Sequence, residues 1–365
     1  MLFFNIDRHA SVIADINNIF INLGHKIDDW SLSGHHWVMN KEKKHIVLND
    51  GTVFDGYISR EVCDKFYDTF KTELEKYDGF VACYPVEFGM LYEKWNKPII
   101  LVECIRHSIQ MYPFIKNNFF DKDFVNFLTN MKKKNLLYYI SNNKGDQWCT
   151  KYLLDINTIH IPNLCEYIGY KCVSKINNFI IHEGSHVKTN GLANCYSLNR
   201  LRNSSWKYSW KDLYEHIGII HNPYNNGSMT IFENYTGNLP MFFPSKKFIL
   251  KLFHKQKTLS QLTPCILYKL EEPDDFNHPY SLRNPIILQK WIDACDFYDE
   301  KNMPYIQFYD SWSDLRKLIL TVNVKDISEK MKKYNIYRKE RIYTLWKNIL
   351  NNLQMNIGYD NIPDF

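Results

Sequence analysis

Short apolar runs alternate with longer stretches of helical periodicity along most of this chain. Leu2–Asp7 is an apolar run typical of a strand, and the residues after it place Val, Ile and Phe at helical spacing until Gly24. Four more strand-like runs follow in the first half, with helical patterns between them: 79–83, 98–102, 136–140 and 158–161. This alternation, with its short connections, favours a mostly parallel sheet covered by helices on both faces.

The same alternation starts again in the second half. Strand-like runs are expected at 179–182, 218–221, 239–243 and 305–309. Helical patterns are expected at 212–217, 286–297 and 314–320, with a helix start near Ser228 and a long amphipathic helix over 326–353. At 365 residues the chain exceeds the size at which a single core stops growing. The sequence therefore predicts two Rossmann-like domains, 1–172 and 173–325, followed by a C-terminal helix and tail, 326–365.

Composition excludes several classes of protein. Lys and Arg exceed Asp and Glu by only 45 to 40, too small a surplus for a dedicated nucleic-acid binder, so no nucleic-acid partner is expected. No apolar stretch approaches the roughly 18 residues needed to span a membrane. The N-terminus lacks the pattern of a signal peptide, and the 9 cysteines form no CxxC pair. These features predict a cytoplasmic protein in a reducing compartment.

The most informative stretch is His221–Ser245, in which a strand ends in a loop rich in Pro, Asn and Gly and a helix opens at Gly227 and Ser228. Such a loop can hold phosphates, because exposed backbone NH groups and the helix dipole both attract anions. Glu233 follows at a position suited to accept hydrogen bonds from sugar hydroxyls, and Gly237 allows close approach of the backbone. An ordinary α/β crossover is the alternative reading of the same pattern.

This stretch resembles the donor-binding motif of nucleotide-sugar glycosyltransferases of the GT-B type, whose C-terminal lobe often carries a Glu, a Gly and then a Pro. The matching residues are Glu233, Gly237 and Pro240, although the Gly stands one position early. In the family, that Glu commonly binds the ribose of the donor, and the preceding loop and helix start bind the diphosphate. The resemblance thus implies these donor-binding residues here: Tyr224, Gly227, Ser228, Met229, Thr230 and Glu233.

The order of the two lobes and the long final helix also fit that family. The chain further resembles glycosyltransferase-like proteins of large DNA viruses at 77–100 and 305–315. These resemblances imply two lobes facing each other across a cleft, with the final helix closing back on the first lobe. They also imply transfer of a hexosyl or pentosyl group from a nucleotide-diphosphate sugar to a hydroxyl of a glycan or glycoprotein, in the host cytoplasm if the protein is viral.

An acceptor hydroxyl needs a base if it is to attack the anomeric carbon with inversion. Asp7 and His9 stand just past the first expected strand, where ligands bind in open α/β sheets and where some relatives of this fold carry a catalytic His or Asp. A neutral His oriented by a carboxylate suits this role at pH 7. Glu87, after the run at 79–83, is a second candidate. The alternative is that Asp7 caps a turn and His9 is partly buried.

Cations on the donor side would stabilise a diphosphate leaving group. Lys188, Arg200 and Arg202 follow the first strand of the second lobe, and Arg106 follows a strand of the first, where a surface ion pair is its alternative role. Fixed cations and helix NH groups can replace the metal that other glycosyltransferases use. We therefore expect no metal and no cofactor besides the nucleotide-sugar substrate.

Two metal-type patterns oppose that expectation. His182–Glu183–His186 matches HExxH, which on a helix would bind zinc, so a zinc metallohydrolase is an alternative function. The flanking residues are poor helix formers, which argues against it. Asp121 and Asp123 mimic a metal-binding DxD, but they precede a helical pattern and suit capping. A non-catalytic sugar-binding or structural protein is the remaining alternative.

Overall fold

The computed structural model describes residues 1–39, 42–106, 122–183, 192, 194–202, 208–256 and 258–355. The chain packs as two compact units. Unit 1 contains the residues up to Asn163 and those from Arg341 on, and unit 2 runs from Leu164 to Glu340. The predicted boundary near residue 172 lies inside unit 2, where the backbone NH of Cys172 donates to the carbonyl of Gly237 (2.7 Å).

Unit 1 is built on a six-stranded sheet whose strand order is β2-β1-β3-β4-β5-β6. Every neighbouring pair is parallel. The strands are β1 (Leu2–Asp7), β2 (Lys26–Ser31), β3 (Gly79–Ala82), β4 (Ile99–Glu103), β5 (Leu137–Ser141) and β6 (Ile159–His160). The chain moves from β1 to one side of the sheet and then returns to β3 on the other side. The order therefore reverses between β1 and β3, which is the topological switch point of this sheet.

Helices follow the strands as the alternation predicts. Those of unit 1 are α1 (Ala10–Asn22), α2 (Arg60–Leu74), α4 (Lys122–Lys133) and α5 (Lys144–Leu154), with 3-10 helices η1 (His36–Met39) and η2 (Val86–Trp95). Ser59 caps α2 by accepting from the backbone NH of Val62, and Asn143 caps α5 in the same way. The helical pattern at 86–95 forms a 3-10 helix rather than an α-helix.

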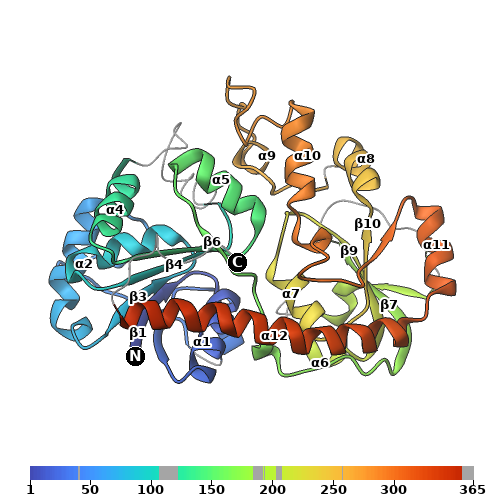
Figure 1. The fold of residues 1–365 in the computed structure, drawn as a ribbon, viewed down its shortest axis with the longest axis horizontal. Coiled ribbons are helices and arrows are strands. Elements are labelled where there is room, and N and C mark those ends of the chain that lie inside the picture. Colours follow the sequence, from blue (N-terminus) through green and yellow to red (C-terminus); the bar gives the residue numbers. More distant parts are fainter. Residues whose placement is uncertain are drawn as a thin grey trace. The chain divides into compact units, whose positions relative to one another are not determined.

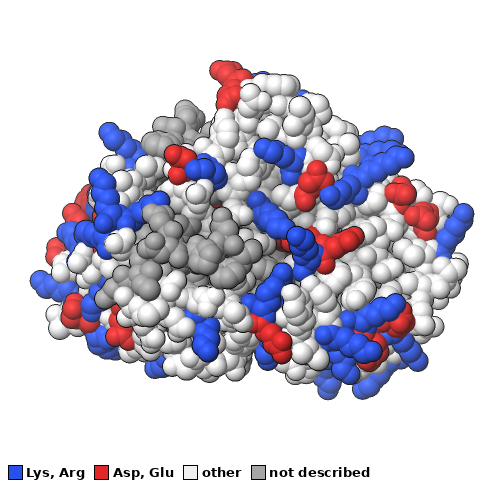
Figure 2. Space-filling view, in the orientation of Figure 1, with Lys and Arg blue, Asp and Glu red and all other residues white. Residues whose placement is uncertain are grey.

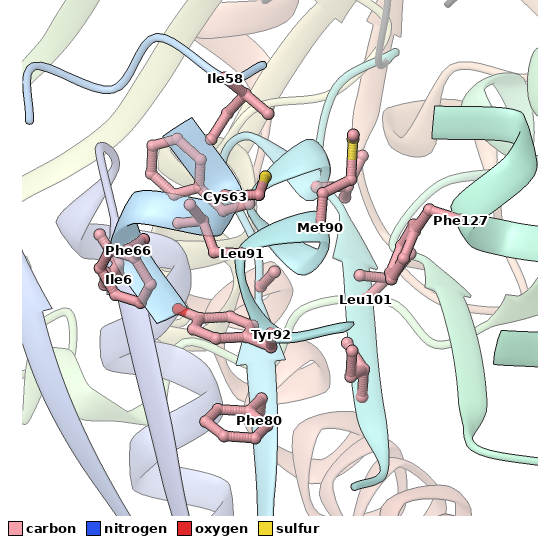
Figure 3. Close-up of a cluster of buried hydrophobic side chains, with 14 of the residues drawn as sticks. Ile6, Ile58, Cys63, Phe66, Phe80, Met90, Leu91, Tyr92, Leu101 and Phe127 are labelled. Carbon is pink, nitrogen blue, oxygen red and sulfur yellow. The ribbon is translucent and has the colours of Figure 1, made fainter. Parts of the chain in front are cut away.

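The core of unit 1 packs η2 and the helices of one face against the sheet (Figure 3). Phe80 of β3 stacks on Tyr92 of η2, with ring centroids 4.5 Å apart. Gly89 lets η2 approach β4 closely, because a Cβ at that position would lie 2.6 Å from a methyl group of Leu101. The tight packing keeps η2, which carries Glu87, close to the carboxyl end of β3.

Unit 2 has a five-stranded sheet in the order β11-β10-β9-β7-β8, again with parallel pairs only. The strands are β7 (Ile176–Glu183), β8 (Cys195–Ser197), β9 (His216–Asn222), β10 (Met241–Pro244) and β11 (Gln307–Tyr309). Numbered from the first strand of each unit, both sheets begin with the order 2-1-3-4-5. The switch point of unit 2 therefore lies between β7 and β9.

The described helices of unit 2 surround this second sheet. They are α6 (Trp210–Leu213), α7 (Met229–Thr236), α8 (Lys246–Gln256), α9 (Pro264–Tyr268), α10 (Pro285–Asp293) and α11 (Trp312–Thr321), with 3-10 helices η3 (Glu166–Ile168), η4 (Leu198–Leu201) and η5 (Asp296–Tyr298). The helix expected over 212–217 is wrong in its second half, because β9 starts at His216 and pairs there with β7. The helix expected over 286–297 ends at Asp293 as α10.

The last helix, α12 (Val324–Gln354), belongs to both units (Figure 1). Its C-terminal part packs in unit 1, where the Trp346 ring lies 5.4 Å from that of Phe20. The prediction of an α/β fold with two parallel sheets and a long C-terminal helix is confirmed. None of the helices in the described part of the chain is long and apolar enough to cross a membrane. Basic and acidic side chains are interspersed on the face shown in Figure 2.

Candidate functional site

A cavity of about 380 Å³ opens in unit 2 at the switch point of its sheet. Ligands of open α/β sheets bind beyond the carboxyl ends of the strands at this place, because the two connections leave in opposite directions there. His182 stands near the end of β7, and Tyr224 follows β9. The cavity is lined by His182, Leu198, Asn199, Arg202, Tyr208, Tyr224, Thr230 and Gln261.

Two of the predicted donor-binding residues, Tyr224 and Thr230, stand on this lining. Gly227 and Ser228 lie between them, just before Met229 begins α7, and Ser228 is the N-cap residue of α7 although its side chain makes no capping hydrogen bond. Backbone NH groups in the first turn of a helix have no carbonyl partner within that helix. The NH of Ile231 donates to the carbonyl of Ser228 (3.0 Å). The first turn of α7 carries the positive end of the helix dipole, and its Thr230 stands on the wall of the cavity.

Gly227 is required for space rather than for its backbone angles. A Cβ at this position would lie 2.1 Å from Oδ2 of Asp296. Asp296 is buried, and its backbone NH donates to the carbonyl of Asn226 (3.0 Å). The turn before α7 is thus packed against η5, and a larger side chain at position 227 would require the Asp296 carboxyl group to shift.

The cation on the described lining is Arg202 rather than Arg200. Arg200 is exposed, and its guanidinium lies 4.7 Å from the centre of the Tyr196 ring. Lys188 lies outside the described residues. The charge of Arg202 reaches the cavity wall, because it helps to lower the pKa of His182. An anionic ligand in this cavity would therefore meet a fixed positive charge.

Four rings stack across the carboxyl end of the sheet beside the cavity. His182 lies on His221 with ring centroids 4.2 Å apart and an interplanar angle of 4°. His221 continues onto Phe243 (5.0 Å), and Phe243 onto Phe297 (4.4 Å). Burial, with a smaller effect of Arg202, lowers the pKa of His182 to about 4, and burial holds that of His221 well below its usual value. Both imidazoles are neutral at pH 7, so the stack is uncharged, and His182 presents it to the cavity.

Glu233 lies behind the cavity wall and is not among the lining residues. Its carboxylate accepts a hydrogen bond from the hydroxyl of Tyr167, and burial raises the pKa of this carboxyl. Burial and the nearby Glu233 together raise the pKa values of Tyr208 and Tyr224, which do line the cavity. Glu233 thus stands next to the two lining tyrosines.

The early glycine of the resembled motif has a structural reason. A Cβ at Gly237 would lie 2.6 Å from the Tyr214 ring, so the close approach that this glycine allows is to a side chain of unit 2. The left-handed position one residue later is taken by Asn238 (φ 60°). Asn is the residue other than Gly that tolerates this conformation best.

The residues predicted for the acceptor side lie at the switch point of unit 1. Asp7 ends β1, and His9 is the N-cap residue of α1. The His9 ring lies 5.2 Å from that of Tyr84, which follows β3, and the backbone NH of Arg8 donates to the carbonyl of Tyr84 (2.9 Å). Glu87 is buried in η2, after the same strand.

The pKa values of Asp7 and His9 are shifted in opposite directions. Burial, and then the neighbouring Asp29, raises the pKa of Asp7 to about 8, while Ser31 and the backbone NH of His9 partly offset the rise. Burial, and then His35, lowers the pKa of His9 to about 4. At pH 7 His9 is therefore neutral and able to accept a proton. Asp7 is mostly protonated at that pH, so it differs from the orienting carboxylate that the sequence suggests.

Replacing Asp7 with Asn is expected to make the melting temperature of the protein less dependent on pH. The folded pKa of about 8 lies above the unfolded value near 3.8, so stability is fully present below pH 4 and is lost as pH rises through 8. The loss is on the order of a few kcal/mol, and Asn cannot undergo it. The measurement is thermal unfolding at pH 5 and pH 8, with the exposed Asp68→Asn as control. An equal fall of melting temperature in Asp7→Asn and wild type would contradict the assigned pKa.

The metal-type patterns do not form metal sites in the described structure. His182 and Glu183 belong to strand β7, whereas HExxH needs both His residues on one helical turn, and His186 lies outside the described residues. Asp123 lies in the first turn of α4, 3.7 Å from Nε of Arg60, and Asp121 is outside the described residues. No group of three or more His, Cys, Asp or Glu side chains in the described ranges is placed to hold a metal ion.

Arg106 is fully buried in unit 1, where the sequence suggested a surface ion pair or a ligand contact. Its Nη1 lies 2.7 Å from Oδ1 of Asp146, which is also buried. Glu103, at the end of β4, accepts hydrogen bonds from Ser141 and Thr150 beside this pair. These residues form a buried polar network of unit 1, so the ion pair of Arg106 is not a surface one.

No protein-family model matches the chain, and a search of curated protein sequences gives no match. Among solved structures, the glycotransferase of kitacinnamycin is 9% identical over 96% of this chain and 98% of its own (TM-score 0.43). The sucrose-phosphate synthase from Thermosynechococcus elongatus is 11% identical over 93% and 98% (0.41), and a spinosyn rhamnosyltransferase is 8% identical over 96% and 100% (0.41). These TM-scores are below 0.5, so the fold rests on the strands and helices described above. The resemblance to viral proteins has no support from these comparisons.

Proposed function

We propose that this protein is a glycosyltransferase of the GT-B type, which binds a nucleotide-diphosphate sugar in the cavity of unit 2 and transfers the sugar to a hydroxyl acceptor. One observation carries the proposal. The cavity lies at the switch point of a 2-1-3-4-5 sheet and brings together Arg202, two tyrosines and the first turn of α7. A fixed cation and helix amides suit a diphosphate, and flat side chains suit a base or sugar.

The size of the cavity agrees with such a ligand. Small-molecule sites in proteins occupy about 300 to 1,000 Å³, and this one measures about 380 Å³. Asn199 and Gln261 add side-chain amides to the lining, which can donate and accept hydrogen bonds to a base. The resemblance assigns ribose binding to Glu233, which is buried behind the lining next to Tyr208 and Tyr224, so these two tyrosines are the groups that a ribose would meet there.

In the proposed reaction the acceptor hydroxyl gives its proton to a base of unit 1 and its oxygen attacks the anomeric carbon. The bond from that carbon to the diphosphate oxygen breaks, and the diphosphate leaves with the electron pair. Arg202 and the first-turn amides of α7 stabilise the charge that grows on it. These groups can perform this function without a metal ion. His9, neutral at pH 7, is the proposed base, and Glu87 is the second candidate.

The test is a thermal-shift screen against UDP, GDP, CMP and dTDP and their common sugar conjugates, with zinc measured in the same sample. A ligand present at one hundred times its dissociation constant stabilises the folded state by about 2.7 kcal/mol. We expect a rise of a few degrees in melting temperature with one nucleotide family. Bound zinc in a one-to-one ratio without any nucleotide shift would instead favour a hydrolase. The absence of both a nucleotide shift and bound zinc would favour a non-catalytic protein.

A further inference from the structure

The C-terminal end of α7 is held by side chains from two other segments of unit 2. The hydroxyl of Thr236, the last residue of the helix, donates to the carbonyl of Leu164. The same oxygen accepts from Nη1 of Arg338 in α12 (2.9 Å). The exposed fraction is 2% for Thr236 and 0% for Arg338. This hydroxyl therefore joins α7, α12 and the start of unit 2 at one buried point.

Further bonds hold the same end of the helix. Nζ of Lys171 donates to the carbonyl of Thr236 (2.8 Å), and the Asn335 amide donates to that of Tyr235 (2.9 Å). The guanidinium of Arg338 also lies 5.5 Å from the centre of the Tyr235 ring. Cations are favourable here, because the C-terminal carbonyls of a helix carry partial negative charge. The C-terminal end of α7 is thus fixed by neighbouring segments.

The opposite end of α7 forms part of the cavity wall. Thr230, in the first turn, lines the cavity, and the side chain of Ser228 does not cap the helix. The helix has 8 residues, so its ends are about 12 Å apart. A tilt of about 5° about the fixed end would move the first turn by about 1 Å, a displacement that can reduce a reaction rate about a hundredfold.

We propose that Thr236 and Arg338 are positioning residues of the cavity, which fix α7 at its C-terminal end and so place its first turn for ligand binding. The proposal rests on the proposed function in one respect, that the cavity holds a nucleoside diphosphate. The start of unit 2 and α12, which both hold α7, are joined by an ion pair between Glu166 and Lys339 (2.8 Å). The segments that hold α7 are therefore also bound to each other.

The experiment compares Thr236→Val, which removes the hydroxyl at nearly constant volume, with Thr236→Ser, which keeps it. Thr321→Val is the matched control, because that exposed hydroxyl bonds only within its own helix, to the carbonyls of Lys317 and Leu318. Two quantities are measured on the full chain: hydrogen exchange of the α7 amides, and the dissociation constants of UDP, GDP and dTDP. We expect Thr236→Val to exchange at least tenfold faster in α7 and to bind the preferred nucleotide about tenfold more weakly. Thr236→Ser and Thr321→Val should match wild type.

Arg338→Met provides the second variant. The side chains of Thr236 and Arg338 meet at one oxygen atom. The dissociation constant of the double variant Thr236→Val, Arg338→Met should therefore be no higher than that of the single variant with the lower affinity. A folded Thr236→Val protein with wild-type exchange in α7 and wild-type affinity would overturn the proposal, as would fully additive losses. If wild type binds none of the nucleotides, the proposed function fails. The exchange measurement then still decides whether Thr236 fixes α7.

Discussion

Replacing His9 with alanine is expected to reduce sugar transfer by a factor of about 10² to 10⁴, the usual contribution of a general base. The His9 ring lies at the switch point of unit 1, beside Tyr84, and is neutral at pH 7 because burial lowers its pKa to about 4. The described residues that line the cavity assigned to the donor belong to unit 2. Nucleotide affinity should therefore remain at the wild-type value while turnover falls.

The pH profile gives an independent test of the same assignment. A base must be deprotonated to act, so the rate should be lost as pH falls through the pKa of His9. With that pKa near 4, kcat/KM should stay level between pH 5 and 7, whereas an ordinary histidine would lose activity below pH 6.5.

The control for both measurements is His45→Ala, which removes an exposed histidine of unit 1. Retained turnover in His9→Ala would exclude His9 as the base. Glu87→Gln would then be the next variant, since that carboxyl is buried in η2 after β3. Loss of turnover in His45→Ala as well would show that turnover also falls when a histidine outside the proposed site is removed.

Much of the fold could be predicted because its central strands are continuous apolar runs. Strands β1, β3, β4 and β9 are buried on both faces, and such strands are the easiest to recognise in a sequence. Strands β2 and β8 were missed because neither is a continuous apolar run. β2 (KIDDWS) carries charged residues, and β8 has 3 residues. Their pairing depends on a neighbouring strand that local sequence does not reveal.

The site was predictable where a loop leads into a helix and unpredictable where the partners are distant in sequence. Tyr224 and Thr230 reach the cavity because they flank the start of α7. The contact of His182 with His221 depends on the pairing of β7 with β9. The sequence carries a signal for it, since both strands contain Ile-Ile-His immediately before their last residue. The choice between Arg200 and Arg202 depends on side-chain direction, which periodicity does not fix.

The second large effect that we expect concerns Arg202, the cation on the described cavity lining. Replacing Arg202 with Met should weaken binding of a nucleoside diphosphate about a hundredfold, because the variant lacks a cation on the cavity wall. Arg200→Met is the matched control, since Arg200 is exposed and packs on Tyr196. It should bind nucleotide as wild type does.

Two comparisons, of nucleoside with diphosphate and of low with high salt, show whether Arg202→Met weakens binding through lost charge or through an altered cavity shape. If Arg202 binds the diphosphate, Arg202→Met should bind the corresponding nucleoside, which has no phosphate, as well as wild type does. The wild-type dissociation constant for the diphosphate should rise with salt more steeply than that of the variant, because salt screens a charge pair that only the wild type makes. Equal losses for nucleoside and diphosphate would mean that the substitution had altered the cavity wall. A loss in Arg200→Met but not in Arg202→Met would move the phosphate site away from this cavity, because only Arg202 of the two stands on its lining.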